Sequence, residues 1–140
     1  MSASNIEIAR SVAVKYYNEE KILNTGDVFF LNGLVEEAET NQTAVEFFKK
    51  AADWYDHHKS WISPNYHGDS YYHLSLMYMN GIPPDYYKAN NAIGKALKLD
   101  PLNMNYQNLR DKVKENLKIY EKEENIGFFR RLWNNIRSRF

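Results

Sequence analysis

The sequence predicts an all-α fold in which helical hairpins stand between an N-terminal helix and C-terminal capping helices. Apolar residues recur at three- and four-residue spacing through most of the 140-residue chain, which is the period of an amphipathic helix. Glycines, prolines and short polar turns separate these segments, where they end helices. A pattern of small and apolar residues also occurs twice, 45 positions apart, which indicates repeated structural units.

The composition favours one packed domain and excludes disulfide or thiolate chemistry. Apolar residues form 44% of the chain and aromatic residues 15%, enough for a core, and cysteine is absent. The formal net charge is zero, which weighs against a nucleic-acid partner. The N-terminus has no signal-peptide pattern, and no apolar run approaches the length of a membrane span. We therefore expect a cytoplasmic protein.

The first half of the chain reads as one helix followed by one hairpin. Ser4 and Glu7 form the pattern of a capping box, and the helix that they begin runs to about Leu23. A hairpin over about 27–60 follows, with a first helix at Asp27–Glu39 and a second that begins at Thr43.

A second hairpin spans about 69–101. Its first helix, 69–80, is apolar on more than one side, so we expect it to pack against neighbours on both sides. Gly81 ends this helix, since glycine tolerates the left-handed conformation of a helix terminus. Asp85 is the expected N-cap of the second helix, which runs to about Leu99 and stops before an Asp-Pro pair.

The two hairpins share residues that carry a resemblance to a known family. The repeated pairs are Ala44 and Ala89, Phe48 and Ile93, Lys50 and Lys95, and Ala51 and Ala96. Together with Leu74, Ser75, Tyr78, Leu97 and Pro101, these residues resemble the tetratricopeptide (TPR) repeat. The Gly81 turn followed by Asp85-x-x-Lys88-Ala89 resembles the Sel1-like variant. The resemblance implies a short α-solenoid that binds a protein or peptide.

In that family the first helix of each hairpin lines a concave binding groove. The resemblance therefore places the candidate groove contacts at Tyr71, Tyr72 and His73. Aromatic side chains are favoured anchors in protein interfaces. We expect Tyr71 or Tyr72 to be partly exposed and Tyr78 to belong to the core.

The C-terminal part reads as a capping helix over about 103–123 and a separate short helix. One apolar stripe runs along the capping helix, through Tyr106, Leu109, Val113, Leu117 and Tyr120. We expect a break at 125–127, which divides the chain into a helical domain, 1–125, and a basic amphipathic helix, 126–140.

This last helix is the strongest functional signal. Its candidate interaction residues are Phe128, Phe129, Arg130, Arg131, Leu132, Trp133, Ile136 and Arg137. Four arginines and no acid lie in 126–140, so the rest of the chain carries 14 basic against 18 acidic residues. Such a helix can pack back on its own body, pair with a second copy as a homodimer, enter a protein groove or lie on an anionic membrane.

The four histidines, His57, His58, His67 and His73, raise the alternative of a metal-dependent hydrolase. The first two are adjacent and point about 100° apart on a helix, and no His-Glu-x-x-His motif occurs. We expect no enzyme, no metal and no cofactor. The sequence favours a non-catalytic adaptor or regulatory protein, with a peripheral membrane adaptor and an immunity-type inhibitor of one toxin or enzyme as further alternatives.

Overall fold

The computed structural model describes residues 24–39, 42–58 and 66–139, and within these ranges the chain forms α-helices joined by turns and no strands. The helices are α2 (Thr25–Ala38), α3 (Thr43–His57), α4 (Tyr66–Met79), α5 (Tyr86–Leu99) and α6 (Met104–Arg137). The predicted all-α class is confirmed. The helix predicted over 4–23 lies outside the described residues.

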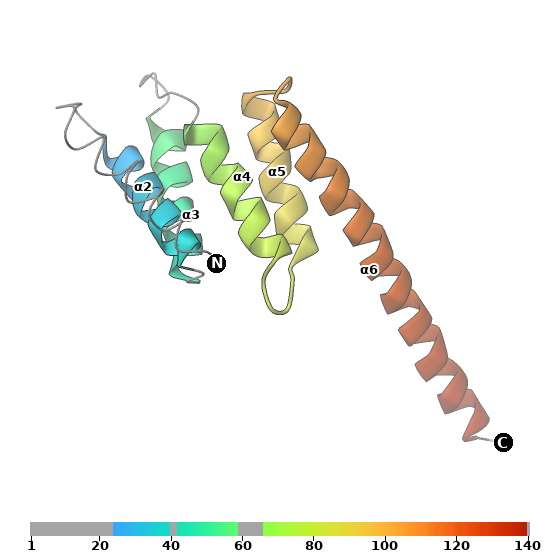
Figure 1. Ribbon diagram of the computed structural model, residues 1–140. Helices are drawn as coiled ribbons and strands as arrows, with labels where there is room; N and C mark the ends of the chain where they lie inside the picture. Colours follow the sequence, from blue (N-terminus) through green and yellow to red (C-terminus); the bar gives the residue numbers. More distant parts are fainter. Residues whose placement is uncertain (1–23, 40–41, 59–65, 140) are drawn as a thin grey trace.

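The helices pack side by side in chain order (Figure 1). α2 contacts α3, α3 contacts α4, α4 contacts α5, and α5 contacts α6. α4 also touches α2 and α6, so it is covered on more than one side, as its apolar pattern predicts. α6 extends well past the ends of the other helices, and its C-terminal part stands away from them (Figure 1).

Side-chain caps fix the beginnings of α2, α5 and α6. Asp85 accepts a hydrogen bond from the Lys88 backbone N–H at 3.0 Å, which confirms it as the N-cap of α5. α2 begins earlier than predicted, because Asn24 rather than Asp27 is its N-cap. α4 begins at Tyr66 rather than at 69, since Gly68 is accommodated inside the helix.

The turn after α4 differs from the expected one. The helix ends at Met79, close to the predicted position, but no glycine in the described ranges adopts positive φ, so the left-handed terminus expected at Gly81 is wrong. The chain is held instead by a backbone hydrogen bond of 2.9 Å from the Asp85 N–H to the Tyr78 carbonyl. The Ile82–Pro83 peptide in this turn is cis.

Small residues let the paired helices approach closely. A Cβ atom added at Gly33 of α2 would lie 2.7 Å from the ring of Phe48 in α3. In the second hairpin Ser75, 42 positions after Gly33, is fully buried and donates a hydrogen bond of 2.8 Å to the carbonyl of Ala89 in α5. The core between these helices includes the predicted positions Ala44, Phe48, Ala51, Ala89, Ile93 and Ala96.

α6 corrects the predicted C-terminal organisation. The sequence predicts a break at 125–127, whereas α6 is continuous from Met104 to Arg137. Glycine inside a helix costs only about 1 kcal/mol relative to alanine, and no proline follows Gly127 to stop the helix. The capping helix and the basic amphipathic helix are therefore two parts of one element.

Candidate functional site

Tyr71 is not a free groove contact. Its side chain is buried, with 8% of its surface exposed, and its hydroxyl donates to Asp56 of α3. Burial and the Asp56 carboxylate together raise the pKa of Tyr71 above its usual range. Of the two tyrosines expected to be partly exposed, only Tyr72 is so.

Tyr72 and His73 fill contacts between helices. The Tyr72 ring stacks on Tyr106 of α6 with ring centroids 5.5 Å apart, and burial raises its pKa. The His73 ring stacks on Phe48 of α3 at 5.0 Å. Its Nδ1 lies 2.7 Å from Oε2 of Glu37 but without the alignment of a hydrogen bond, so the contact is a close approach of a ring and a carboxylate. These residues join α4 to its neighbours and do not form an open site.

The groove of this structure includes Tyr71 of the three predicted contacts but neither Tyr72 nor His73. It lies over α4, between α3 and α5, and has a volume of about 620 Å³. Tyr71, Leu74 and Tyr78 of α4 contribute to its lining, so Tyr78 borders the groove as well as packing against the core. A pocket of this volume lies within the range of sites that hold small molecules or peptide side chains.

Four lysines surround the groove. Lys49 and Lys50 come from α3, and Lys88 and Lys95 come from α5. Lys50 lies over the ring of Phe29, Lys88 over that of Tyr78 and Lys95 over that of Tyr71, with Nζ to centroid distances of 5.8, 5.6 and 5.4 Å. Tyr78 and, less strongly, Glu46 raise the pKa of Lys49. Three of the four ammonium groups thus lie over aromatic faces.

The acidic side chains at the groove are fewer and partly engaged. Asp53 and Asp56 of α3 also line it, so the lining carries four lysines against two aspartates. Asp56 accepts the hydroxyl of Tyr71 and lies 2.6 Å from Nε2 of His67. Asp85 reaches Lys88 only at 4.0 Å, the limit of an ion pair. Glu46, which is outside the lining, lies 3.7 Å from Lys49. The side chains that line the groove carry an excess of positive charge.

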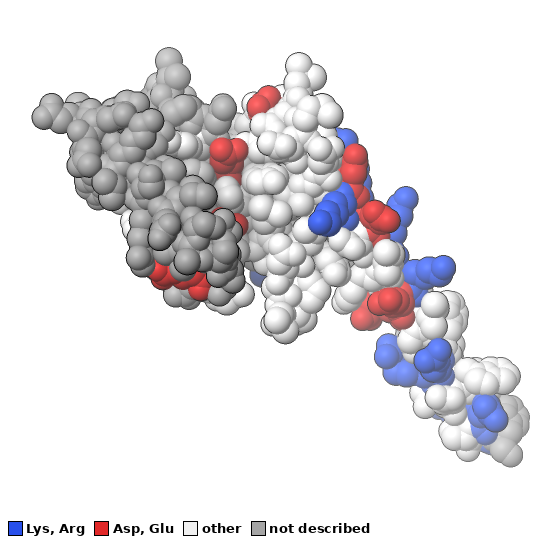
Figure 2. All heavy atoms as spheres, in the orientation of Figure 1, with Lys and Arg blue, Asp and Glu red and all other residues white. Residues whose placement is uncertain are grey.

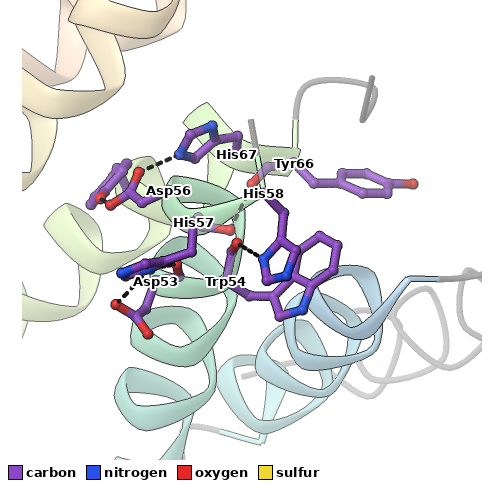
Figure 3. A network of polar contacts seen from close by, with 9 residues as sticks. Asp53, Trp54, Asp56, His57, His58, Tyr66 and His67 are labelled. Atoms are coloured by element: carbon purple, nitrogen blue, oxygen red, sulfur yellow. Dashed lines mark hydrogen bonds and ion pairs between the residues drawn. The ribbon is translucent and has the colours of Figure 1, made fainter. Parts of the chain in front are cut away.

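The histidines beside this groove do not converge on one point (Figure 3). Nδ1 of His57 lies 2.7 Å from the Asp53 carbonyl, and Nδ1 of His58 lies 2.7 Å from the Trp54 carbonyl. The His58 ring also stacks on Trp54 at 4.0 Å. Within the described ranges, no group of three histidine, aspartate or glutamate side chains is placed to hold a metal ion.

The predicted C-terminal interaction residues lie together on the distal part of α6, where Phe128, Phe129, Leu132, Trp133 and Ile136 are all exposed. None of these side chains is buried against the rest of the described chain. In the part of the chain that the structure describes, no helix combines the length and the apolar character needed to cross a bilayer.

Comparison of the chain with protein-family models, with curated proteins and with solved structures gave no match. Sequence reasoning placed Lys50 and Lys95 in the repeat but missed them as site residues. Both lysines occupy the same position in their hairpins, and in each hairpin an aromatic residue lies near the start of the preceding helix, which is a signal that could have identified them. The sequence pattern does not show that α4 lies between the two helices that carry these lysines.

Proposed function

We propose that this protein is a non-catalytic interaction module of TPR- or Sel1-like helical hairpins, and that it holds an acidic extended segment of a partner protein in the groove over α4. The observation that carries the proposal is the set of four lysines around an open groove with an aromatic floor. Carboxylates of a partner would pair with the ammonium groups, and Leu74 and Tyr78 would contact its apolar side chains.

Equivalent contacts in the two hairpins support the repeat interpretation. Lys50 lies over Phe29 in the first hairpin, and Lys95 lies over Tyr71 in the second. The lysines are 45 positions apart and the rings 42 positions apart, close to the offset of the repeated sequence pattern. Chain-order packing of hairpins is the arrangement expected of a helical repeat array.

The contacts of the polar side chains favour binding over catalysis. Asp56 is engaged by Tyr71 and His67, and the rings of His57 and His58 contact carbonyls of their own helix. A general base needs an accessible proton to abstract and an activated nucleophile needs a base beside it. The lysines, by contrast, are exposed and line one groove.

The test measures binding of a fluorescein-labelled oligoglutamate peptide to the full chain by fluorescence anisotropy. We expect binding that weakens with salt, and a loss of about tenfold or more in the double variant Lys50→Glu/Lys95→Glu, because two charge contacts become repulsive. The matched control is Lys112→Glu/Lys114→Glu, which makes the same charge change on exposed positions of α6 outside the groove.

An equal loss in both double variants would mean that only overall charge matters, and the groove proposal would be wrong. Unchanged binding in the groove variant would be equally decisive against it. Circular dichroism of each variant verifies that the helices remain folded.

A further inference from the structure

The distal part of α6 carries an exposed apolar surface, which we call the distal face: Ile126, Phe128, Phe129, Leu132, Trp133 and Ile136. Each of these side chains is between 42% and 65% exposed. At about 100° per residue they cover a continuous arc of about 160° on the helix surface. Exposed apolar patches of this kind mark sites of association.

The distal face does not point toward the body of the protein. The residues of α6 that are buried against the other helices are Tyr106, Leu109 and Val113. Because α6 is continuous, the centre of the distal face is rotated by about 140° from this buried stripe. The distal face therefore cannot pack on its own body while α6 stays intact. A flat surface can instead contact the whole length of the distal face, because the body lies on the opposite side of α6.

The charges around the distal face fit an anionic surface. Arg130, Arg131, Arg137 and Arg139 lie in 126–139 and no acid does, and basic side chains mark this end of the molecule in Figure 2. Toward the body this side of the helix carries Lys118 and Lys122 but also Glu121, so the purely basic stretch is confined to 126–139.

The same charges disfavour two protein occupants taken from a second copy. Pairing the distal faces of two copies would place Arg130 and Arg137 beside a partner segment, 126–139, that contains arginines and no acid. The lysine-lined groove of a second copy would repel the arginines of this helix. Neither repulsion arises with a surface of anionic lipid.

We infer that the distal face binds an anionic lipid surface, with α6 lying in the plane of the membrane interface. Trp133 and the phenylalanine rings would enter the boundary between headgroups and acyl chains, as in other basic amphipathic helices. The arginines would contact lipid phosphates. This surface is separate from the groove over α4, so the inference does not rest on the proposed peptide binding.

The test is co-sedimentation of the full chain with vesicles of phosphatidylcholine alone and of phosphatidylcholine mixed with phosphatidylglycerol. We expect binding to the anionic vesicles only, weakened by salt, with a blue shift of Trp133 emission. The variant Phe129→Ser/Trp133→Ser should lower the bound fraction about tenfold or more. The variant Arg130→Gln/Arg137→Gln should lower it and flatten the salt dependence.

The matched control is Ile82→Ser/Leu102→Ser, which removes two apolar side chains that are 99% and 84% exposed outside the distal face. Equal losses in this control and in the distal variant would overturn the inference. So would absence of binding to both vesicle types, or lipid-free self-association that Phe129→Ser/Trp133→Ser removes without any vesicle binding by the unaltered chain. The last result would assign the distal face to a second copy.

Discussion

Gly33 and Gly94 each lie inside a helix, yet their surroundings are opposite. A Cβ atom at Gly33 would come within 2.7 Å of the fully buried Phe48 ring, whereas a Cβ atom at Gly94 of α5 would meet nothing within 4 Å. Phe48 has little space to move, because His73 stacks on it and Phe30 lies beside it. Gly33 is therefore required by contact between helices, and Gly94 is not.

We expect Gly33→Ala to lower the free energy of unfolding by about 1–3 kcal/mol, since overpacked cores must shift. Gly94→Ala should raise it by about 0.5–1 kcal/mol, because alanine loses less backbone entropy in a helix. Urea unfolding of both variants followed by circular dichroism measures the difference. A Gly33→Ala protein as stable as the unaltered chain would show that α2 and α3 are farther apart than described here.

Sequence periodicity was sufficient for the buried alanines and Ile93 but not for Tyr71. The period of a helix identifies which side of it is apolar, and Ala89, Ile93 and Ala96 follow from this alone. The Tyr71 ring belongs to the core together with Leu74, and its hydroxyl donates to Asp56 on a neighbouring helix. Asp56 lies 15 positions before Tyr71 and on another helix, so the helical spacing around Tyr71 does not indicate this partner.

α5 and α6 show which helix ends can be predicted from local sequence signals. Prediction of α5 was accurate at both ends, since Asp85 caps it and an Asp-Pro pair follows Leu99. The break predicted at 125–127 was wrong, because Gly127 lacks a proline or a left-handed conformation to end the helix. Strong helix formers before Gly127 extend the helix through it.

Gly127→Pro should separate the two parts of α6. Proline removes one backbone hydrogen bond and clashes with the carbonyl of Glu123, at a cost of about 3 kcal/mol. We expect amide hydrogen exchange to become fast in 128–137 and to stay slow around Leu109 and Val113, which are held by the body. Loss of protection in both regions would show that the distal part supports the fold.

Gly127→Ala is the matched control for this experiment. Its Cβ atom would meet only the end of the Arg131 side chain at 3.6 Å, an ordinary contact. Helix content measured by circular dichroism should stay the same or rise.

At the scale of the whole described structure, three tyrosine hydroxyls donate to aspartates on other helices. Tyr55 reaches Asp27, Tyr71 reaches Asp56 and Tyr106 reaches Asp69, which links α2 to α3, α3 to α4 and α4 to α6. For Tyr71 and Tyr106, burial first and then the aspartate raise the pKa of the hydroxyl well above its ordinary value of 10.0. These contacts connect the described helices from one end of the row to the other.

Stability should therefore fall in alkali. A group whose pKa is raised by folding contributes stability below its unfolded pKa, near 10, and that contribution is lost as the pH rises toward the folded pKa. We expect Tyr71→Phe/Tyr106→Phe to be less stable at neutral pH, by about 1–3 kcal/mol for each lost hydrogen bond. Its free energy of unfolding should then fall less between neutral pH and strong alkali than that of the unaltered chain.

Urea unfolding at several pH values measures this slope. Tyr86→Phe is the control, because in the described part of the chain the Tyr86 ring packs beside Tyr120 and its hydroxyl donates to no aspartate. A slope in the double variant equal to that of the control would mean that other groups cause the alkaline loss.

The arrangement of hairpins could be predicted from the repeated pattern, while the groove could not. The repeated sequence pattern predicts paired helices and relates Lys50 to Lys95 by position. The groove exists only because α4 lies between the helices that carry these lysines, so that residues from three elements meet. Whether these residues come together depends on the packing angle of the helices, and a spacing pattern carries no information about that angle.

Because α6 is continuous, the number of residues between its buried stripe and its distal face determines how these two surfaces are oriented relative to each other. Inserting or deleting one residue between Val113 and Ile126 would turn the distal end by about 100° relative to the body. Much of this connecting segment is exposed and contacts few side chains, so its composition can drift while its length cannot. Among relatives of this chain, we would look there for a gap-free stretch of variable sequence.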